Sequence, residues 1–294
     1  MKETLQKALQ SSWIIIKLVI PIYILADILY YYNILSYISF LVEPFTSVLD
    51  LPVESSLAII SGIFLNLYAA VAFAAPLDMA PQQWSILAIF LGVCHSLVVE
   101  SVIIKQLGVS NLYSYSLRFF GGLVIAYSAT LLPQEYFSST ITSNTFTKEE
   151  YNSIGSLLYH SFYNATILTF KIVLLISLLI LIMDYIKNMK FIKQSSKNIS
   201  KGFSIMVGIF LGITYGAGIL INEATNLKKS DIFFIATFLM ICHAIIEDTL
   251  LFVMFGADFM MVIIIRTIWA IILAYLFTNF RRKAPAFRHG DIRR

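Results

Sequence analysis

Charged side chains are scarce in this chain. Of its 294 residues, 21 are Lys or Arg and 17 are Asp or Glu, so that 13% are charged, whereas a soluble domain averages about 25%. Cysteine is also sparse, with two residues, too few for a disulfide framework. These shortages exclude a soluble enzyme, a nucleic-acid-binding protein and a disulfide scaffold.

Apolar residues are correspondingly abundant. Hydrophobic residues make up 59% of the chain, with long runs at 13–32, 167–183 and 260–277, comparable with the ~20 residues that a membrane-spanning helix needs. The first run is followed by Tyr30, Tyr31 and Tyr32 and by no small-residue cleavage site, so we expect a retained span rather than a signal peptide. The composition predicts a multi-pass membrane protein.

The chain contains an internal duplication. Cys94-His95 and Cys242-His243 recur at an offset of 148, which also brings Gly108 onto Gly256, Arg118 onto Arg266 and Glu100 onto Asp248. Gly62 matches Gly208 at an offset two residues shorter. Shared order at a fixed offset indicates a repeat. The predicted organisation is a first half at 1–133, an external linker at 134–155, a second half at 156–280 and a basic cytoplasmic tail at 281–294.

Basic residues decide how the apolar segments cross the membrane. Hydropathy indicates eight segments, at 12–33, 54–76, 83–105, 111–133, 157–187, 203–222, 231–255 and 258–280. If all eight crossed, the lysine-rich stretch 187–201 would lie outside, against the positive-inside rule. If 54–76 and 203–222 are re-entrant hairpins instead, 16 of the 21 basic residues become cytoplasmic. Eight acidic residues then become external: Glu43, Asp50, Glu54, Asp78, Glu135, Glu149, Glu150 and Asp258.

Helix-interrupting residues favour the two hairpins. Asn66 interrupts the first, and Gly212, Thr214, Gly216 and Gly218 interrupt the second. The alternative is two unbroken spans that tolerate glycine, which is common in membrane helices. The predicted fold is an all-α polytopic membrane protein, an inverted-topology repeat with about six transmembrane helices and two re-entrant helical hairpins. Surface helices are expected at 33–51 outside and 187–201 inside.

Ionisable residues inside spans are costly and mark candidate sites. The two Cys-His pairs lie at the middle of 83–105 and 231–255, at matching depth. His243 and Glu247 are four residues apart, on one helical face, whereas Glu100 is five residues from His95 and is expected to point elsewhere, as is its equivalent Asp248. The predicted solute-binding residues are Asn66, Tyr68, Cys94, His95, Glu100, Thr214, Tyr215, Cys242, His243, Glu247 and Asp248.

Three interpretations of the Cys-His cluster stay open. The first is hydrogen bonding to a polar solute with proton coupling, since His titrates near neutral pH. The second is polar pairing that fixes helix packing. The third is transition-metal binding, which is weakened because adjacent Cys and His point about 100° apart on a helix. No metal and no cofactor are predicted.

Two further groups each have two interpretations. Asn66 with Tyr68, and Thr214 with Tyr215, either contact a ligand at the hairpin tips or cap the helix breaks. Arg118 and Arg266 lie seven or eight residues into their spans, where snorkelling to the interface is favoured. The alternative is that they pair with a buried carboxylate or hold an anionic substrate.

Three sequence blocks resemble a known family. They are Gly62-Ile-Phe-Leu-Asn-Leu-Tyr-Ala-Ala-Val-Ala72, Cys94-His-Ser-Leu-Val-Val-Glu100 and Cys242-His-Ala-Ile-Ile-Glu-Asp-Thr-Leu-Leu-Phe252. They look like the nucleoside recognition, or Gate domain, membrane proteins, whose gate segments also resemble parts of concentrative nucleoside transporters, the ferrous-iron permease and spore-maturation proteins. The resemblance implies a transporter-like core without fixing the substrate.

The resulting prediction is a secondary transporter or permease, not an enzyme, for a small polar solute of nucleoside-like chemistry. Hairpin tips would contact the solute while His95, His243 and Glu247 tune binding by protonation. The alternatives are a lipid-phosphate phosphatase or polyprenyl-lipid flippase, and a non-transporting partner subunit. Expected partners are H⁺ or Na⁺ as coupling ion, membrane lipid and a second copy of the chain. The expected location is the cell (plasma or inner) membrane, with both termini cytoplasmic.

Overall fold

The computed structural model describes residues 2–37, 39–138, 151, 153–188, 205, 208–209, 212 and 227–283, and every element assigned within them is helical. Most of the second predicted hairpin, including Thr214 and Tyr215, lies outside these residues, as do the linker from 139 to 150 and the lysine-rich stretch from 189 to 201.

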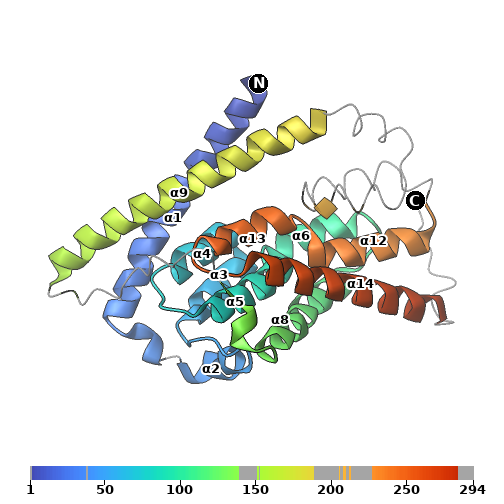
Figure 1. The fold of residues 1–294 in the computed structure, drawn as a ribbon, viewed down its shortest axis with the longest axis horizontal. Coiled ribbons are helices and arrows are strands. Elements are labelled where there is room, and N and C mark those ends of the chain that lie inside the picture. The colour runs from blue at the N-terminus through green and yellow to red at the C-terminus, as the bar shows by residue number, and fades with distance from the viewer. Residues whose placement is uncertain are drawn as a thin grey trace.

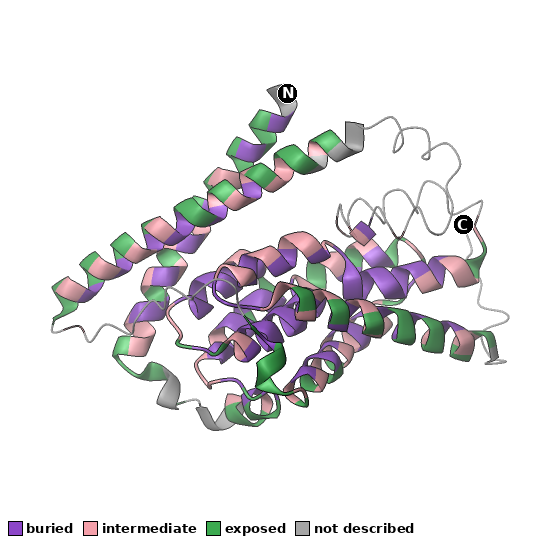
Figure 2. Ribbon diagram, viewed as in Figure 1, coloured by how far each residue is buried: buried purple, intermediate pink, exposed green. Residues whose placement is uncertain are grey.

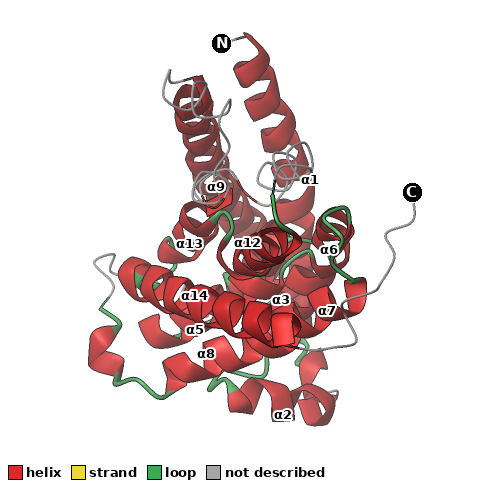
Figure 3. Ribbon diagram, turned by 90° about the vertical axis from the view of Figure 1, so that its right-hand side faces the viewer, coloured by secondary structure: helices red, strands yellow, loops and turns green. Residues whose placement is uncertain are grey.

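Two long helices form an arm beside the rest of the molecule. α1 (Lys2–Tyr31) and α9 (Ile154–Asn188) pack against each other, and both project away from the other helices (Figures 1 and 3). Buried polar contacts join them: Ser161 donates to Asp27 at 2.6 Å, and Thr4 donates to Asp184 at 2.7 Å. The predicted surface helix at 33–51 consists of η1 (Ile34–Tyr37) and α2 (Ser39–Val48).

The first predicted hairpin folds back on itself. α3 (Ser55–Phe64) ends at Leu65, and α4 (Leu67–Ala74) begins after Asn66. A Cβ atom built on Gly62 would lie 3.1 Å from the Cβ of Ala70, whereas eight residues of continuous helix advance about 12 Å. The chain therefore reverses at the interruption that Asn66 marks.

Two helices that the sequence predicts as continuous are broken at the Cys-His pairs. α5 (Pro81–Cys94) and α6 (Leu97–Lys105) are bent by 40° around His95 and Ser96. α12 (Lys229–Cys242) and α13 (Ile245–Val253) are interrupted in the same way at His243 and Ala244. The residue after each histidine has a left-handed backbone, with φ 46° at Ser96 and φ 44° at Ala244, a conformation that costs a non-glycine residue about 1–2 kcal/mol.

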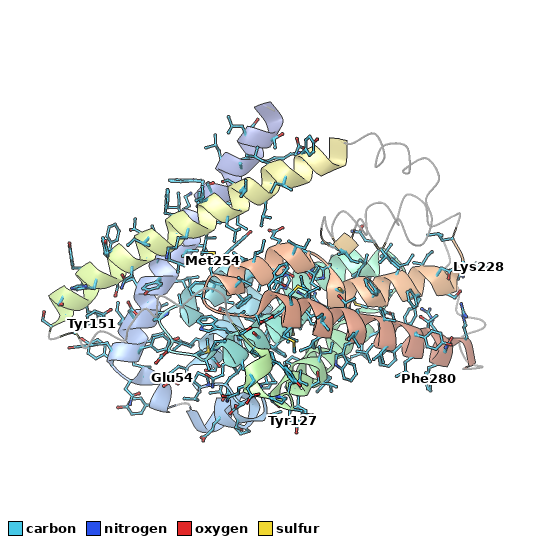
Figure 4. The ribbon with its side chains drawn as sticks, in the orientation of Figure 1. Glu54, Tyr127, Tyr151, Lys228, Met254 and Phe280 are labelled. Atoms are coloured by element: carbon cyan, nitrogen blue, oxygen red, sulfur yellow. The ribbon has the colours of Figure 1, made fainter. Side chains whose placement is uncertain are left out.

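The last segment of each half is a helix that packs beside the broken one. In the first half, α7 (Asn111–Ser116), a π-helical segment η2 (Leu117–Gly121) and α8 (Gly122–Thr130) follow one another directly. In the second half, α14 (Phe259–Lys283) runs back along α12 and α13. Lys228 and Phe280 consequently lie at one end of the molecule, opposite Glu54 and Tyr151 (Figure 4).

The same elements recur at the offset of 148. This offset superposes the bounds of α5 and α12, the bounds of α6 and α13, and the first residues of α7 and α14. Their caps recur as well, since Ser110 accepts from the backbone N–H of Tyr113 and Asp258 accepts from that of Met261. Gly108 and Gly256 both have positive φ, at 79° and 112°.

Within the part of the chain that the structure describes, four helices are long and apolar enough to cross a membrane, at Thr4–Tyr31, Ile154–Ile182, Lys229–Val253 and Phe259–Arg282, and the bent pair α5–α6 makes a fifth. In the most apolar 18-residue window of Lys229–Val253, 72% of the residues are buried, against 28% in each of the other three. Figure 2 shows the same contrast between the inner helices and the arm. The broken helices therefore form the centre.

Candidate functional site

The two helix breaks meet at the centre of the molecule. The imidazole rings of His95 and His243 come from different halves, and their centroids are 5.3 Å apart. His95 is 7% exposed and His243 2% exposed. The prediction that the two Cys-His positions share one depth agrees with this distance, although the histidines lie in helix breaks and not in mid-helix.

Hairpin backbone supports each break from the side. The backbone N–H of Ser96 donates to the carbonyl of Gly62 at 2.8 Å, and that of Ala244 donates to the carbonyl of Gly208 at 3.3 Å. A Cβ atom at Gly62 would lie 2.6 Å from Leu91, and one at Gly208 would collide with Leu239. A larger residue at either position would therefore force the facing leucine side chain to move.

Glu100 connects the two histidines. Its Oε1 lies 3.1 Å from Nε2 of His95, and its Oε2 lies 3.2 Å from Nε2 of His243 and 2.6 Å from Nη2 of Arg118. The prediction that Glu100 points away from the histidines is wrong. That prediction assumed an unbroken helix, and the left-handed turn at Ser96 instead swings the first turn of α6 back towards the break.

The helix break removes the basis of the predicted pairing of His243 with Glu247. The spacing of four residues places two side chains on one face only while the helix continues, and here the helix is interrupted at His243 and Ala244, so the pairing stays a prediction. The Tyr68 hydroxyl, from α4, is hydrogen-bonded to the Glu247 carboxylate. Tyr68 and Glu247 therefore join the hairpin to α13, while Glu100 from the other half lies beside His243.

The two arginines are fully buried, so the prediction that they snorkel is wrong. Arg118 and Arg266 are both 0% exposed. Arg118 donates to the carbonyls of Val93 and His95 at 2.7 and 2.6 Å. These groups end α5 and have no partner within that helix. A guanidinium has several N–H donors, so it can satisfy the free carbonyls of such a helix end.

Arg266 performs the equivalent contacts on α12 and adds one across the halves. It donates to the carbonyls of Ile241 and His243 at 3.2 and 3.3 Å and to that of Gly92 at 2.6 Å. Its Nη2 lies 3.5 Å from Asp248. Asp248 was expected to point elsewhere, yet this contact places it at the centre as well.

Both predicted cysteines and Asn66 belong to the described residues. Cys94 and Cys242 are buried free thiols, and Sγ of Cys242 lies 3.7 Å from Oγ1 of Thr267. The Asn66 side chain accepts a hydrogen bond from the backbone N–H of Ala69 at 3.0 Å, so it caps α4 as the alternative interpretation expected. A role for Asn66 in solute contact stays a prediction.

Three buried side-chain atoms beside the histidines make no hydrogen bond among the described residues. They are Asp248 Oδ2, Arg118 Nη1 and Arg266 Nη1. Buried polar groups are nearly always satisfied, and exceptions need an explanation such as a bound ligand. His95, His243 and Asp248 also place ligand atoms within 4.8 Å of one another, a spacing that can hold a metal ion. We call these three residues, with Glu100, Arg118 and Arg266, the central cluster.

One buried acid escaped the sequence analysis. Asp27 is 6% exposed and accepts the hydrogen bond from Ser161 described above. Its signal was available, since it is a carboxylate inside an apolar run. It holds α1 to α9 and lies outside the central cluster.

A curated relative covers nearly the whole chain. The chain is 24% identical, over 297 residues, to the "Uncharacterized membrane protein YvoD" of Bacillus subtilis (strain 168), with 93% of this chain and 92% of the relative covered. Together with the apolar helices, this likeness decides the class of protein. The chain is a membrane protein. No protein-family model and no solved structure matches it, so membership of the Gate domain family stays a prediction.

Proposed function

We propose that this membrane protein is a secondary transporter, or permease, for a small polar solute of nucleoside-like chemistry, with the solute bound at the central cluster. The observation that carries the proposal is the meeting of two broken helices at a set of buried charged residues. Many transporters bind solute near the membrane midplane, where discontinuous helices expose backbone groups and polar side chains.

The proposed topology is an inverted repeat of six spans and two hairpins in the cell membrane. The recurrence of helices, breaks and caps at an offset of 148 supports two copies of one unit. With three crossings and one hairpin in each, the copies are antiparallel. Both termini are then cytoplasmic, in agreement with the basic residues Lys228, Arg281 and Arg282 near one end, where Arg282 donates to Ser230 at 3.2 Å.

Unpaired donors and acceptors in the central cluster indicate the chemistry of the solute. Nη1 of Arg118 and Nη1 of Arg266 are donors with no hydrogen-bond partner among the described residues, and Oδ2 of Asp248 is such an acceptor. A solute that carries both donors and acceptors, as nucleosides do, matches this set. Apolar solutes would leave the same atoms unsatisfied, at a cost of about 1–3 kcal/mol for each atom.

The lipid-phosphate enzyme is the weaker alternative. It requires arginines beside a headgroup at the membrane interface, and the two arginines here are fully buried and engaged on helix-end carbonyls.

The test is a thermal-shift screen of nucleosides, nucleobases and other small polar solutes on the purified full-length protein, followed by uptake of each hit in proteoliposomes. We expect at least one solute to raise the melting temperature of the wild type and to be taken up. The shift should disappear in His243→Gln and Glu100→Gln and persist in His160→Gln, whose histidine lies on α9 among aromatic rings. Equal shifts in all four proteins would contradict the proposed site.

A further inference from the structure

We propose that the central cluster binds one divalent transition-metal ion, with ligands from both halves of the chain. The ligand atoms are Nε2 of His95, Nε2 of His243 and an oxygen of Asp248. This inference rests on the proposed function only for the role of the ion, which is to bind a neutral or anionic oxygen atom of the solute. Binding of the ion itself does not depend on transport.

The orientation of both imidazoles fits metal ligation. Nδ1 of His95 lies 2.8 Å from the carbonyl oxygen of Leu91, and Nδ1 of His243 lies 2.8 Å from that of Leu239. A carbonyl oxygen only accepts hydrogen bonds, so each Nδ1 carries the proton. A metal ion binds the neutral ring, and in that form the lone pair is on Nε2, the atom that faces the centre. Metal-binding histidines are held in this way by a backbone carbonyl on their other nitrogen.

Distances within the cluster bring the ligand atoms together. The ligand atoms of His95, His243 and Asp248 lie within 4.8 Å of one another. Glu100 orients both rings, because its carboxylate oxygens lie 3.1 Å from Nε2 of His95 and 3.2 Å from Nε2 of His243. Nitrogen and oxygen ligands lie about 2.0–2.1 Å from zinc, so the three ligand atoms would draw closer together around a bound ion.

The donor set defines the class of ion. Two imidazoles and a carboxylate suit first-row divalent ions such as Zn²⁺ and Co²⁺. The thiols are not ligands, because Sγ of Cys242 contacts Thr267 and the candidate metal set contains neither cysteine. The objection that adjacent Cys and His cannot share an ion therefore does not apply, since the ion lies between histidines of different halves.

The test uses the full-length protein, purified in detergent and freed of metal with a chelator. Co²⁺ is titrated while the visible absorption is recorded, and Zn²⁺ is titrated by calorimetry. We expect one ion per chain in the wild type and in His160→Gln. His243→Gln and Asp248→Asn should each weaken binding at least tenfold, with the elution volume on size exclusion unchanged.

Two variants are tested so that the experiment still gives an answer if one of them does not fold. Wild-type protein that binds no Co²⁺ or Zn²⁺ would overturn the inference, and so would equal affinity in whichever variant retains its elution volume. The outcome is separable from that of transport. If a solute stabilises the protein equally in excess chelator, the role of the ion is contradicted and the proposed transport function is not. If the protein binds one metal ion but no solute in the screen, the proposed transport function is contradicted and the metal site is not.

Discussion

The two halves of this protein build the same helix break and use it differently. Glu100 in the first half reaches both histidines and Arg118, at 3.1, 3.2 and 2.6 Å, whereas its equivalent Asp248 lies 3.5 Å from Arg266. An aspartate is one methylene shorter than a glutamate, so the two acids cannot make the same contacts from the same helix position. The difference teaches that the duplicated scaffold is symmetric while the centre is not. Equivalent substitutions in the two halves should therefore have different effects on stability.

The largest difference between the halves is expected in the energies of the two arginine–carboxylate pairs. Arg118→Gln leaves Glu100 beside no guanidinium and frees two carbonyls of α5, so we expect the free energy of unfolding to fall by about 3–5 kcal/mol. In double-mutant cycles measured by unfolding in mixed micelles, Glu100 with Arg118 should couple by about 2–3 kcal/mol, and Asp248 with Arg266 by less than about 1 kcal/mol. Equal coupling energies in the two halves would remove the asymmetry.

Exchanging the acids tests their lengths directly. Glu100→Asp should lower the free energy of unfolding by about 1.5–3 kcal/mol, since it loses the charged hydrogen bond to His95. Asp248→Glu keeps the charge and adds reach, so it should change stability by less than about 1 kcal/mol. Matching losses in the two variants, measured under the same unfolding conditions, would show that side-chain length is not the cause.

The glycines beside the breaks should respond alike in both halves. Gly62→Ala and Gly208→Ala each place a methyl group against a leucine of the broken helix, which should cost about 1–3 kcal/mol by overpacking. Gly155→Ala is the matched control, because nothing lies within 4 Å of a Cβ atom there. A loss confined to one half would mean that its hairpin supports the break and that the other does not.

The smallest expected effect concerns the left-handed residues. Ala244→Gly removes a steric penalty and should raise the free energy of unfolding by about 1 kcal/mol. Ser96→Gly should gain less, because it also removes the hydrogen bond from the Ser96 hydroxyl to the carbonyl of Leu65 at 3.1 Å. Destabilisation by Ala244→Gly would show that the conformation is not strained.

The sequence predicted the helical class, the hairpin at 54–76 and most members of the central cluster. It failed at the breaks because neither Ser96 nor Ala244 is a residue that signals a left-handed turn. Once the helices were assumed to be continuous, spacing paired His243 with Glu247 and dismissed Glu100. Burial of the arginines could not be predicted either, since their acceptors are backbone carbonyls that exist only because the helices are broken.

If the proposed transporter binds its solute at the paired breaks, the breaks must open to each side of the membrane in turn. The chain has two natural cysteines, so a background with Cys94→Ala and Cys242→Ala allows single cysteines at Ser96→Cys and Ala244→Cys. Each is labelled in sealed vesicles of both orientations with a charged, membrane-impermeant thiol reagent. Our account predicts that both positions react from both faces. Reaction from one face alone at both positions, or none before denaturation, would contradict it.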